Sequence, residues 1–313
     1  MAVTGLDIGY GWTKGKYEDI YFIQPSVLGD KKPLHDENKK DGYIIHEDYF
    51  LGELALRHSD IKFYSLNDSK ASNWTTEILI KASLAYLQSD GSHIVTGLPI
   101  DFYFKQREQF SELIKSLNGT FTSIEVIGSP RLTQHIQTQH CKIVPQPLGA
   151  AMDYLLDDYG ELAQKEDARG RILVVDWGRY TLDLLVLDSM EIHKSSCSPN
   201  NLGIEVFYTL LKRLIHEKTG KIPSNYEMDY IVKSQIYGKY NISDSISTAF
   251  KAVSSQILME IESMNMNFDQ ILIVGGQAEN LARHLQIKEA IVGDQLSNLR
   301  GYEKIGVRQW REE

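Results

Sequence analysis

The chain has 313 residues, more than a single hydrophobic core usually organises, so we expect two lobes. Its 42% hydrophobic and 24% charged residues are ordinary for a globular protein, and they exclude disordered, collagen-like and coiled-coil classes. The formal net charge of −9 gives no general attraction to nucleic acid or to an anionic membrane surface, which argues against direct DNA binding.

The sequence carries no sign of export. Its first residues, MAVTGLDIGYG, lack the basic flank and the long apolar stretch of a signal peptide. No apolar run approaches the ~20 residues that a membrane-spanning helix needs. The two cysteines, Cys141 and Cys197, lie far apart and form no CxxC pair, which is typical of unpaired thiols in a reducing compartment. We therefore expect a cytoplasmic protein with no membrane partner.

The first part of the chain opens with antiparallel strands and then alternates helices with strands. The patterns predict strands at residues 3–8, 13–17, 19–23, 94–98, 121–127 and 140–144, a small hairpin at 43–52, and helices at 75–87 and 103–117. The charged stretch 30–42 contains Pro33 and predicts a solvated loop. We assign residues 1–145 to a first α/β lobe.

A second lobe is expected over residues 146–293. It begins with a helix from Leu148 to Tyr159, with Pro147 in its first turn. The patterns then predict strands at 172–176, 181–188, 191–196 and 270–274, and helices at 202–216, 226–237, 246–264 and from Gly275-Gly276 to near Leu285. The C-terminal segment 294–313 is expected to complete the first lobe.

One pattern recurs at long range, a strand followed by an Asp-x-Gly turn and a second strand. It occurs in LDIGYGWTK, residues 6–14, and in VDWGRYTLD, residues 175–183. Glycine lets the backbone approach a ligand closely, and successive amides can bind an anion. Asp7 and Asp176 would not touch phosphate, but they can hold a hydrated Mg²⁺ that bridges phosphate oxygens. A single Asp-x-Gly is more often an ordinary β-turn, whereas the pair predicts a polyphosphate clamp.

These segments resemble a known superfamily. The two hairpins resemble the phosphate-1 and phosphate-2 motifs of the actin, sugar kinase and heat-shock chaperone ATPases, and ILIVGGQAENL, residues 271–281, resembles their adenosine motif. VPQPLGAA, NNLGIEV and QLSNLRGYEKIG are similar, in order, to segments of the bacterial plasmid-segregation actins, the ParM-like proteins. The resemblance covers nearly the whole chain and implies an α/β, two-lobed actin-like fold of duplicated RNase H-like domains with a nucleotide cleft between them.

The resemblance also implies roles for individual residues. Gln146 falls where the family positions the attacking water, so we predict that Gln146, Asp176 and Asp7 are catalytic and that both aspartates bind Mg²⁺ through water. Lys14 would offset phosphate charge. The predicted nucleotide-binding residues are Gly9, Gly11, Trp12, Thr13, Lys14, Gly178, Arg179, Tyr180, Thr181, Asp183, Gly203, Glu205, Gly275, Gly276 and Gln277. Trp177 and Arg179 depart from the small residues common in the second hairpin.

Simpler structural interpretations stay open for several of these residues. Gln146 can cap the helix that follows it, and Lys14 can be a solvated strand lysine. Glu205 can be an ordinary helix-surface glutamate, and Gly275-Gly276 a tight strand-to-helix turn. The tyrosines of one short region, Tyr226, Tyr230, Tyr237 and Tyr240, fit either a packed surface or an assembly contact.

The function implied by the resemblance is a polymerising, nucleotide-dependent ATPase of plasmid or DNA segregation. ATP, or GTP, with Mg²⁺ would close the lobes and promote assembly into a helical homopolymer, and hydrolysis would loosen it. A DNA-binding adaptor would link the filament to its cargo, and no metal other than Mg²⁺ is expected. The alternatives are a small-molecule kinase of the same superfamily and a non-polymerising nucleotide-binding scaffold.

Overall fold

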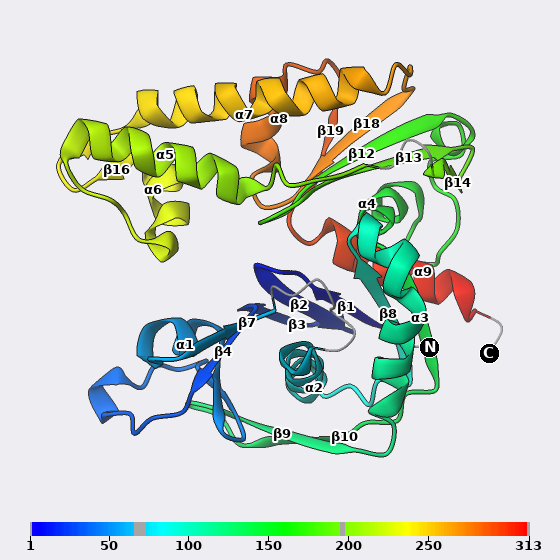
Figure 1. Cartoon of the computed structure of the whole chain (residues 1–313). Helices are drawn as coiled ribbons and strands as arrows, with labels where there is room; N and C mark the ends of the chain where they lie inside the picture. Colours follow the sequence, from blue (N-terminus) through cyan, green and yellow to red (C-terminus); the bar gives the residue numbers. More distant parts are fainter. Residues whose placement is uncertain (1, 66–72, 195–197, 312–313) are drawn as a thin grey trace. The chain divides into compact units, whose positions relative to one another are not determined.

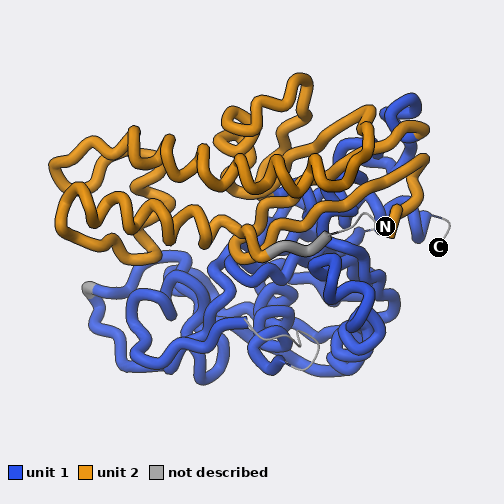
Figure 2. Tube along the Cα trace, turned by 45° about the horizontal axis from the view of Figure 1, so that its top comes forward, with its two compact units in different colours: residues 1–168, 296–313 blue, residues 169–295 orange. Residues whose placement is uncertain are grey.

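The structure, a computed structural model, describes residues 2–65, 73–194 and 198–311. They form two compact units (Figure 2). Unit 1 comprises the chain up to Ala168 together with the segment from Leu296 onward, and unit 2 comprises Arg169–Gln295. The chain therefore passes from one unit to the other at residues 168–169 and again at residues 295–296.

The central sheet of unit 1 has the strand order β11-β8-β1-β2-β3. Its strands are β1 (Thr4–Ile8), β2 (Trp12–Tyr17), β3 (Ile20–Pro25), β8 (His93–Leu98) and β11 (His140–Pro145). β1, β2 and β3 form an antiparallel meander, whereas β1, β8 and β11 run parallel. β1 is buried over its whole length. The strands predicted for this part of the sequence are confirmed.

A second sheet of unit 1 has the order β10-β9-β5-β6-β4-β7. It contains β4 (Val27–Asp30), β5 (Ile44–His46), β6 (Tyr49–Leu51), β7 (Lys62–Tyr64), β9 (Phe121–Val126) and β10 (Leu132–His135). β5 and β6 confirm the hairpin expected at 43–52. The sequence analysis missed β4, β7 and β10, which have three or four residues each, too few for a clear alternating pattern. The predicted loop 30–42 begins at the last residue of β4 and otherwise contains a short 3₁₀ turn, η1 (Asp36–Asn38).

The helices of unit 1 are α1 (Gly52–His58), α2 (Trp74–Leu87), α3 (Ile100–Ser116), α4 (Gln146–Leu155) and α9 (Ser297–Gln309), with a 3₁₀ turn η3 (Asp167–Arg169) at its boundary. α2 begins where the Asn73 side chain accepts a hydrogen bond from the Thr75 N–H (3.0 Å). It contributes Leu79, Ile80 and Leu84 to the core. The helices predicted at 75–87 and 103–117 are confirmed, while α1 was missed because seven residues give little periodicity.

Helices α4 and α9 pack against each other (Figure 1). A Cβ added to Gly301 would collide with the carbonyl oxygen of Gly149, so glycine is required where the helices cross. Asp153 of α4 adds ion pairs with Arg300 (2.8 Å) and Lys304 (3.0 Å) of α9. These contacts place α4 and the segment up to residue 168 in unit 1, whereas the sequence analysis assigned residues 146–168 to the second lobe.

The sheet of unit 2 has the order β14-β13-β12-β18-β19, and β15 also pairs with β13. Its strands are β12 (Arg171–Trp177), β13 (Leu182–Asp188), β14 (Glu191–Ile192), β15 (Ser198–Asn200), β18 (Gln270–Val274) and β19 (Ile291–Val292). β12 and β13 are antiparallel, and β12 runs parallel to β18. The predicted strands at 172–176, 181–188 and 270–274 are confirmed. The strand expected at 191–196 is seen only at its start, and residues 195–196 lie outside the described part.

The helices of unit 2 are α5 (Ile204–Thr219), α6 (Met228–Ser234), α7 (Ser243–Ser263) and α8 (Ala278–Leu285), with a 3₁₀ turn η5 (Asn225–Glu227) and a hairpin β16 (Ile236–Tyr237), β17 (Tyr240–Asn241). α5 and α7 lie side by side (Figure 1), and the ring centroids of Phe207 and Phe250 are 4.1 Å apart. The helix predicted at 226–237 ends earlier, because Gln235 adopts a left-handed conformation and the chain turns into the hairpin.

Two further sequence expectations concern the thiols and membranes. Cys141 forms no disulfide, and burial raises the pKa of its thiol to about 12, so this side chain is an unreactive packing residue. Cys197 lies outside the described residues. In the part of the chain that the structure describes, no helix combines the length and the hydropathy needed to cross a bilayer.

The crossing of α4 and α9 generates a prediction for stability. Alanine exceeds glycine in helix propensity by about 1 kcal/mol, so propensity alone would make Gly301→Ala stabilising. We expect instead a loss of about 1–3 kcal/mol in the free energy of unfolding, because the added methyl group has no room. Urea unfolding measures the change. Gly276→Ala is the matched control, since its Cβ meets nothing nearer than 3.9 Å. Equal stability of the two variants would contradict the tight crossing.

Candidate functional site

The first hairpin of unit 1 turns sharply between β1 and β2. The Gly9 N–H donates to the Trp12 carbonyl oxygen (3.0 Å), and the paired residues on either side are Ile8 with Thr13 and Asp7 with Lys14. A Cβ on Gly9 would lie 2.7 Å from that carbonyl oxygen, so the turn needs glycine at this position.

Ser26, which the sequence analysis did not single out, fastens this first turn. Its N–H donates to the Gly11 carbonyl (3.0 Å), and its hydroxyl donates to the Gly9 carbonyl (2.6 Å). The Ser26 and Thr13 hydroxyl oxygens lie 2.9 Å apart. These bonds hold Gly9, Gly11 and Thr13, all predicted nucleotide-binding residues, in one fixed loop. A serine just after β3 has no motif around it that could have revealed this role.

The hairpin of unit 2 repeats the geometry of the first. The Gly178 N–H donates to the Thr181 carbonyl oxygen (2.9 Å), and the paired residues are Trp177 with Leu182 and Asp176 with Asp183. Turn length, closing hydrogen bond and register are therefore the same in both hairpins. The bulky Trp177 is explained by packing, because its side chain is fully buried and its indole N–H donates to the Leu202 carbonyl (2.8 Å).

Asp7 is the polar centre of the unit 1 site. Its carboxylate is 3% exposed, and its two oxygens accept hydrogen bonds from the Lys14 ammonium (2.9 Å) and from the Gln146 amide nitrogen (2.8 Å). Gln146 is the first residue of α4, and its side chain reaches back to β1 rather than capping its own helix. The structure thus brings together three residues that the sequence predicted for the site.

Asp176 and Asp183 are opposed on the neighbouring strands of the unit 2 hairpin. They are 8% and 2% exposed, and directly paired residues of antiparallel strands project from the same face of a sheet. The Thr181 hydroxyl donates to an Asp183 oxygen (2.9 Å). Where unit 1 pairs a carboxylate with a lysine, unit 2 places two carboxylates together. Oxygen donors of this kind suit a hydrated Mg²⁺.

Helix α5 starts directly on the second turn. The N–H groups of Ile204 and Glu205 donate to the carbonyls of Gly178 (3.0 Å) and Arg179 (2.9 Å), so the turn supplies acceptors for the first turn of the helix. A Cβ on Gly203 would collide with the backbone of Tyr180, and this explains the glycine. The Arg179 guanidinium lies 2.9 Å from the Glu205 carboxylate. These two predicted residues therefore bind each other.

Tyr208 of α5 lies against Arg179 of the second turn, and it was not predicted from the sequence. The Arg179 guanidinium lies over its ring at 4.7 Å. Its hydroxyl donates to the Asp229 carboxylate. Burial, with the Asp229 charge second, raises the pKa of Tyr208 far above its usual range. Only its apolar spacing within α5 was visible in the sequence, and that spacing indicated a core residue.

The glycines of the adenosine motif differ in what they require. Gly275 has φ of +115°, and a Cβ there would collide with the Trp177 carbonyl, so the turn after β18 depends on glycine. Gly276 is open, with nothing nearer than 3.9 Å to an added Cβ. Gln277 precedes α8 and accepts a hydrogen bond from the Asn280 side chain (2.8 Å). The tight-turn interpretation of Gly275 is thereby established, and Gly276 leaves space beside it.

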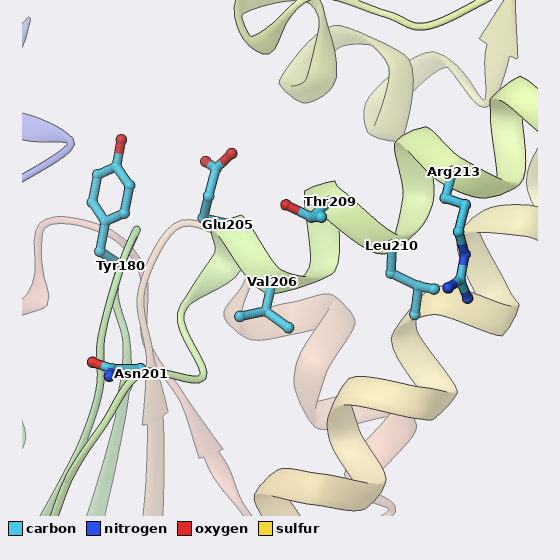
Figure 3. A pocket seen from close by; sticks show the side chains of 7 residues that line it. All are labelled: Tyr180, Asn201, Glu205, Val206, Thr209, Leu210 and Arg213. Atoms are coloured by element: carbon cyan, nitrogen blue, oxygen red, sulfur yellow. The ribbon is translucent and has the colours of Figure 1, made fainter.

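A cavity of about 650 Å³ adjoins the second turn within unit 2 (Figure 3). Figure 3 shows Tyr180 at one end and Arg213 at the other, with residues of α5 between them. Its wall consists of Tyr180, Asn201, Glu205, Val206, Thr209, Leu210 and Arg213. Tyr180 and Glu205 are the predicted nucleotide-binding residues in this wall. The cavity therefore borders the turn without including its glycines.

A prediction follows from the raised pKa of Tyr208. An unfolded tyrosine ionises near pH 10, whereas the buried one resists ionisation, so its contribution to stability is complete below pH 10 and is lost as the pH rises further. We expect Tyr208→Phe to lower the free energy of unfolding by about 1 kcal/mol at neutral pH, and this deficit to shrink above pH 10. Urea titrations across this pH range test it, with Tyr226→Phe, an exposed tyrosine, as the control. A deficit that does not change with pH would refute the assignment.

Comparisons with known sequences agree with this geometry. Residues 5–149 match the family described as actin like proteins N terminal domain, and residues 174–287 match the C-terminal family described as archaeal actin homologue MreB-like. The two matched regions include every predicted site residue. No curated protein matches the sequence.

Solved structures of actin-like proteins match over nearly the whole length. The archaeal actin homologue Ta0583 in complex with ADP is 21% identical, with 98% of this chain and 100% of that chain covered and a TM-score of 0.74. ParM in a 15-stranded filament from Clostridium botulinum is 21% identical, with 98% and 99% covered and a TM-score of 0.72. Bacillus thuringiensis ParM with ATP is 13% identical, with both chains fully covered (100%) and a TM-score of 0.70.

At these identities the structural likeness establishes the fold alone. It confirms the expected fold class, a mixed α/β, two-lobed actin fold. The family follows from the two sequence matches, which together cover most of the chain and include both Asp-x-Gly hairpins. The chain belongs to the actin-like protein family.

Proposed function

We propose that this protein is an ATPase that polymerises when it binds ATP and Mg²⁺ and that serves in plasmid or DNA segregation. The single observation that carries the proposal is the pair of Asp-x-Gly hairpins with the same turn, closing bond and register, one in each unit. A phosphate chain bound by both hairpins would couple the nucleotide to the conformation of the whole protein. The reaction would take place in the cytoplasm.

The phosphate chemistry rests on backbone amides and one cation. The glycines of the two turns, Gly9 and Gly178, allow close approach of main-chain N–H groups to phosphate oxygens. Lys14 would exchange part of its bond to Asp7 for a phosphate contact, since its ammonium lies at the turn and carries three donors. In unit 2, Asp176 and Asp183 would hold Mg²⁺ through water, and the ion would neutralise charge on the phosphates.

The hydrolytic step is assigned to Gln146. Its amide nitrogen already donates to Asp7 (2.8 Å), which directs the amide oxygen away from that carboxylate. A water bonded to this oxygen would be oriented for attack on the terminal phosphate. A neutral amide cannot act as a strong base, so hydrolysis would be slow and a filament could persist before it disassembles.

Self-assembly is supported by exposed apolar side chains at one end of unit 2. Ile222, Tyr226, Tyr230 and Ile236 are each at least half exposed. Exposed large apolar side chains of this kind are typical of protein contacts. ParM from Clostridium botulinum forms a 15-stranded filament, which makes a homopolymer the first assembly to test for this chain. A DNA-binding adaptor would connect the filament to cargo, because the charge of −9 does not favour direct DNA binding.

The metal role of Asp176 predicts a loss of Mg²⁺-dependent hydrolysis. We expect Asp176→Ala to lower the phosphate-release rate about 10–100-fold, because one of the two carboxylates that orient the hydrated ion is gone. Asp188→Ala is the matched control, since it lies at the far end of the same hairpin and pairs with Arg171. Circular dichroism verifies folding of both. Hydrolysis at the parental rate in Asp176→Ala would refute the metal role.

The proposed coupling between bound nucleotide and conformation predicts that assembly depends on which nucleotide is bound. Right-angle light scattering should rise with ATP and Mg²⁺ or with a non-hydrolysable analogue, and should stay low with ADP, because only the triphosphate stabilises the assembling state. Gln146→Ala should assemble with ATP and persist longer than the parent. Equal scattering with all three nucleotides would favour the non-polymerising scaffold. Transfer of the terminal phosphate to a small hydroxyl compound would favour the kinase.

A further inference from the structure

The C-terminal helix α9 contacts the first turn of α4, where Gln146 lies. The Asn298 side-chain oxygen accepts a hydrogen bond from the Ala150 N–H (3.1 Å), and Gly301 packs directly on the Gly149 carbonyl. Tyr302, the next residue of α9, is fully buried. The start of α4 is therefore held by a segment from the other end of the sequence.

Tyr302 extends from this crossing to the stem of Gln146. A Cβ added to Gly97, near the end of β8, would collide with the Tyr302 hydroxyl and would lie 2.9 Å from Cγ of Gln146. A Cβ added to Gly149 would lie 2.6 Å from Cε1 of the same ring. The tyrosine ring thus lies across Gly97 and Gly149, and both positions are glycine where the ring needs space. Gln146 Cγ and the Tyr302 hydroxyl therefore both lie beside Gly97.

The other end of Gln146 is held by Asp7. A carboxylate that also pairs with Lys14 is an acceptor, so the amide nitrogen of Gln146 must face it and the amide oxygen must face away. This hydrogen bond determines that the amide nitrogen faces Asp7 and the amide oxygen faces away. It leaves the Gln146 stem free to turn about its single bonds. The Tyr302 side chain, which lies beside both Gly97 and Gly149, would restrict that freedom.

We propose that Tyr302 is a positioning residue for hydrolysis, which acts by holding the Gln146 stem so that the amide oxygen can orient the attacking water. This inference rests on the proposed ATPase function and extends it to a side chain outside the predicted nucleotide site. Tyr302 does not bind nucleotide in this arrangement. Its loss should slow the chemical step and leave nucleotide affinity unchanged.

The test is a double-mutant cycle on single-turnover hydrolysis. Tyr302→Leu should slow hydrolysis about tenfold, because a small misplacement of an orienting group costs at least that much. Tyr302→Phe keeps the ring and loses only the hydroxyl, so it should slow hydrolysis less than Tyr302→Leu does. In a Gln146→Ala background, Tyr302→Leu should have no further effect, and the dissociation constant for ADP should not change in any variant. Equal slowing in both backgrounds, or the parental rate in Tyr302→Leu, would overturn the inference.

A second variant and an NMR measurement complete the test. If Tyr302→Leu does not fold, Gly97→Ala is the second variant, because its methyl group would collide with the Tyr302 hydroxyl and crowd the Gln146 stem. The same tenfold loss, absent in the Gln146→Ala background, is expected. If the parent hydrolyses no nucleotide, the proposed function fails. The positioning role is then tested independently, by the NMR signal of the Gln146 side-chain amide. That signal is identified by its loss in Gln146→Ala. That signal should shift in Tyr302→Leu, and an unchanged signal would overturn the inference.

Discussion

One backbone hydrogen bond closes each of the two hairpins, and the arrangement of each site depends on it. The Gly9 N–H bonds the Trp12 carbonyl, and the Gly178 N–H bonds the Thr181 carbonyl, so each chain reverses within four residues. A turn this tight needs glycine. In each hairpin an aspartate lies two residues before that glycine, near the end of the first strand of the hairpin. In unit 2 the same turn also supplies the acceptors on which α5 begins.

The two turns share geometry and differ in charge. The residue opposite the aspartate is Lys14 in unit 1 and Asp183 in unit 2. The first arrangement is neutral as a pair and supplies a cation for phosphate, while the second concentrates negative charge and suits a metal ion. The two turns thus offer complementary chemistry, a cation in one and a pair of carboxylates in the other, which is the physical basis of the proposed function.

The long elements were predictable because their patterns are local. α2 and α3 show apolar residues at helical spacing, and β1 and β12 are continuous buried runs next to glycine turns. α1 and β10 escaped prediction because they are too short for periodicity to appear. The fold class was predictable from the order of the motifs. The placement of α4 was not, since it depends on contacts with α9, which lies more than a hundred residues further along the chain.

The residues of the candidate site were likewise only partly predictable from the sequence. Asp7, Asp176 and the turn glycines could be identified from sequence, because the conformation of a tight turn is set by a few adjacent residues. Three contacts join segments far apart in the chain: the bond of Asp7 to Gln146, the Arg179 guanidinium over the Tyr208 ring, and the Tyr302 ring beside Gly97 and Gly149. Side chains of this kind carry no local pattern that distinguishes them from ordinary core residues. The sequence alone therefore determined the turns and their chemistry, and the tertiary structure decided which distant side chains hold them, because those contacts exist only after the helices pack.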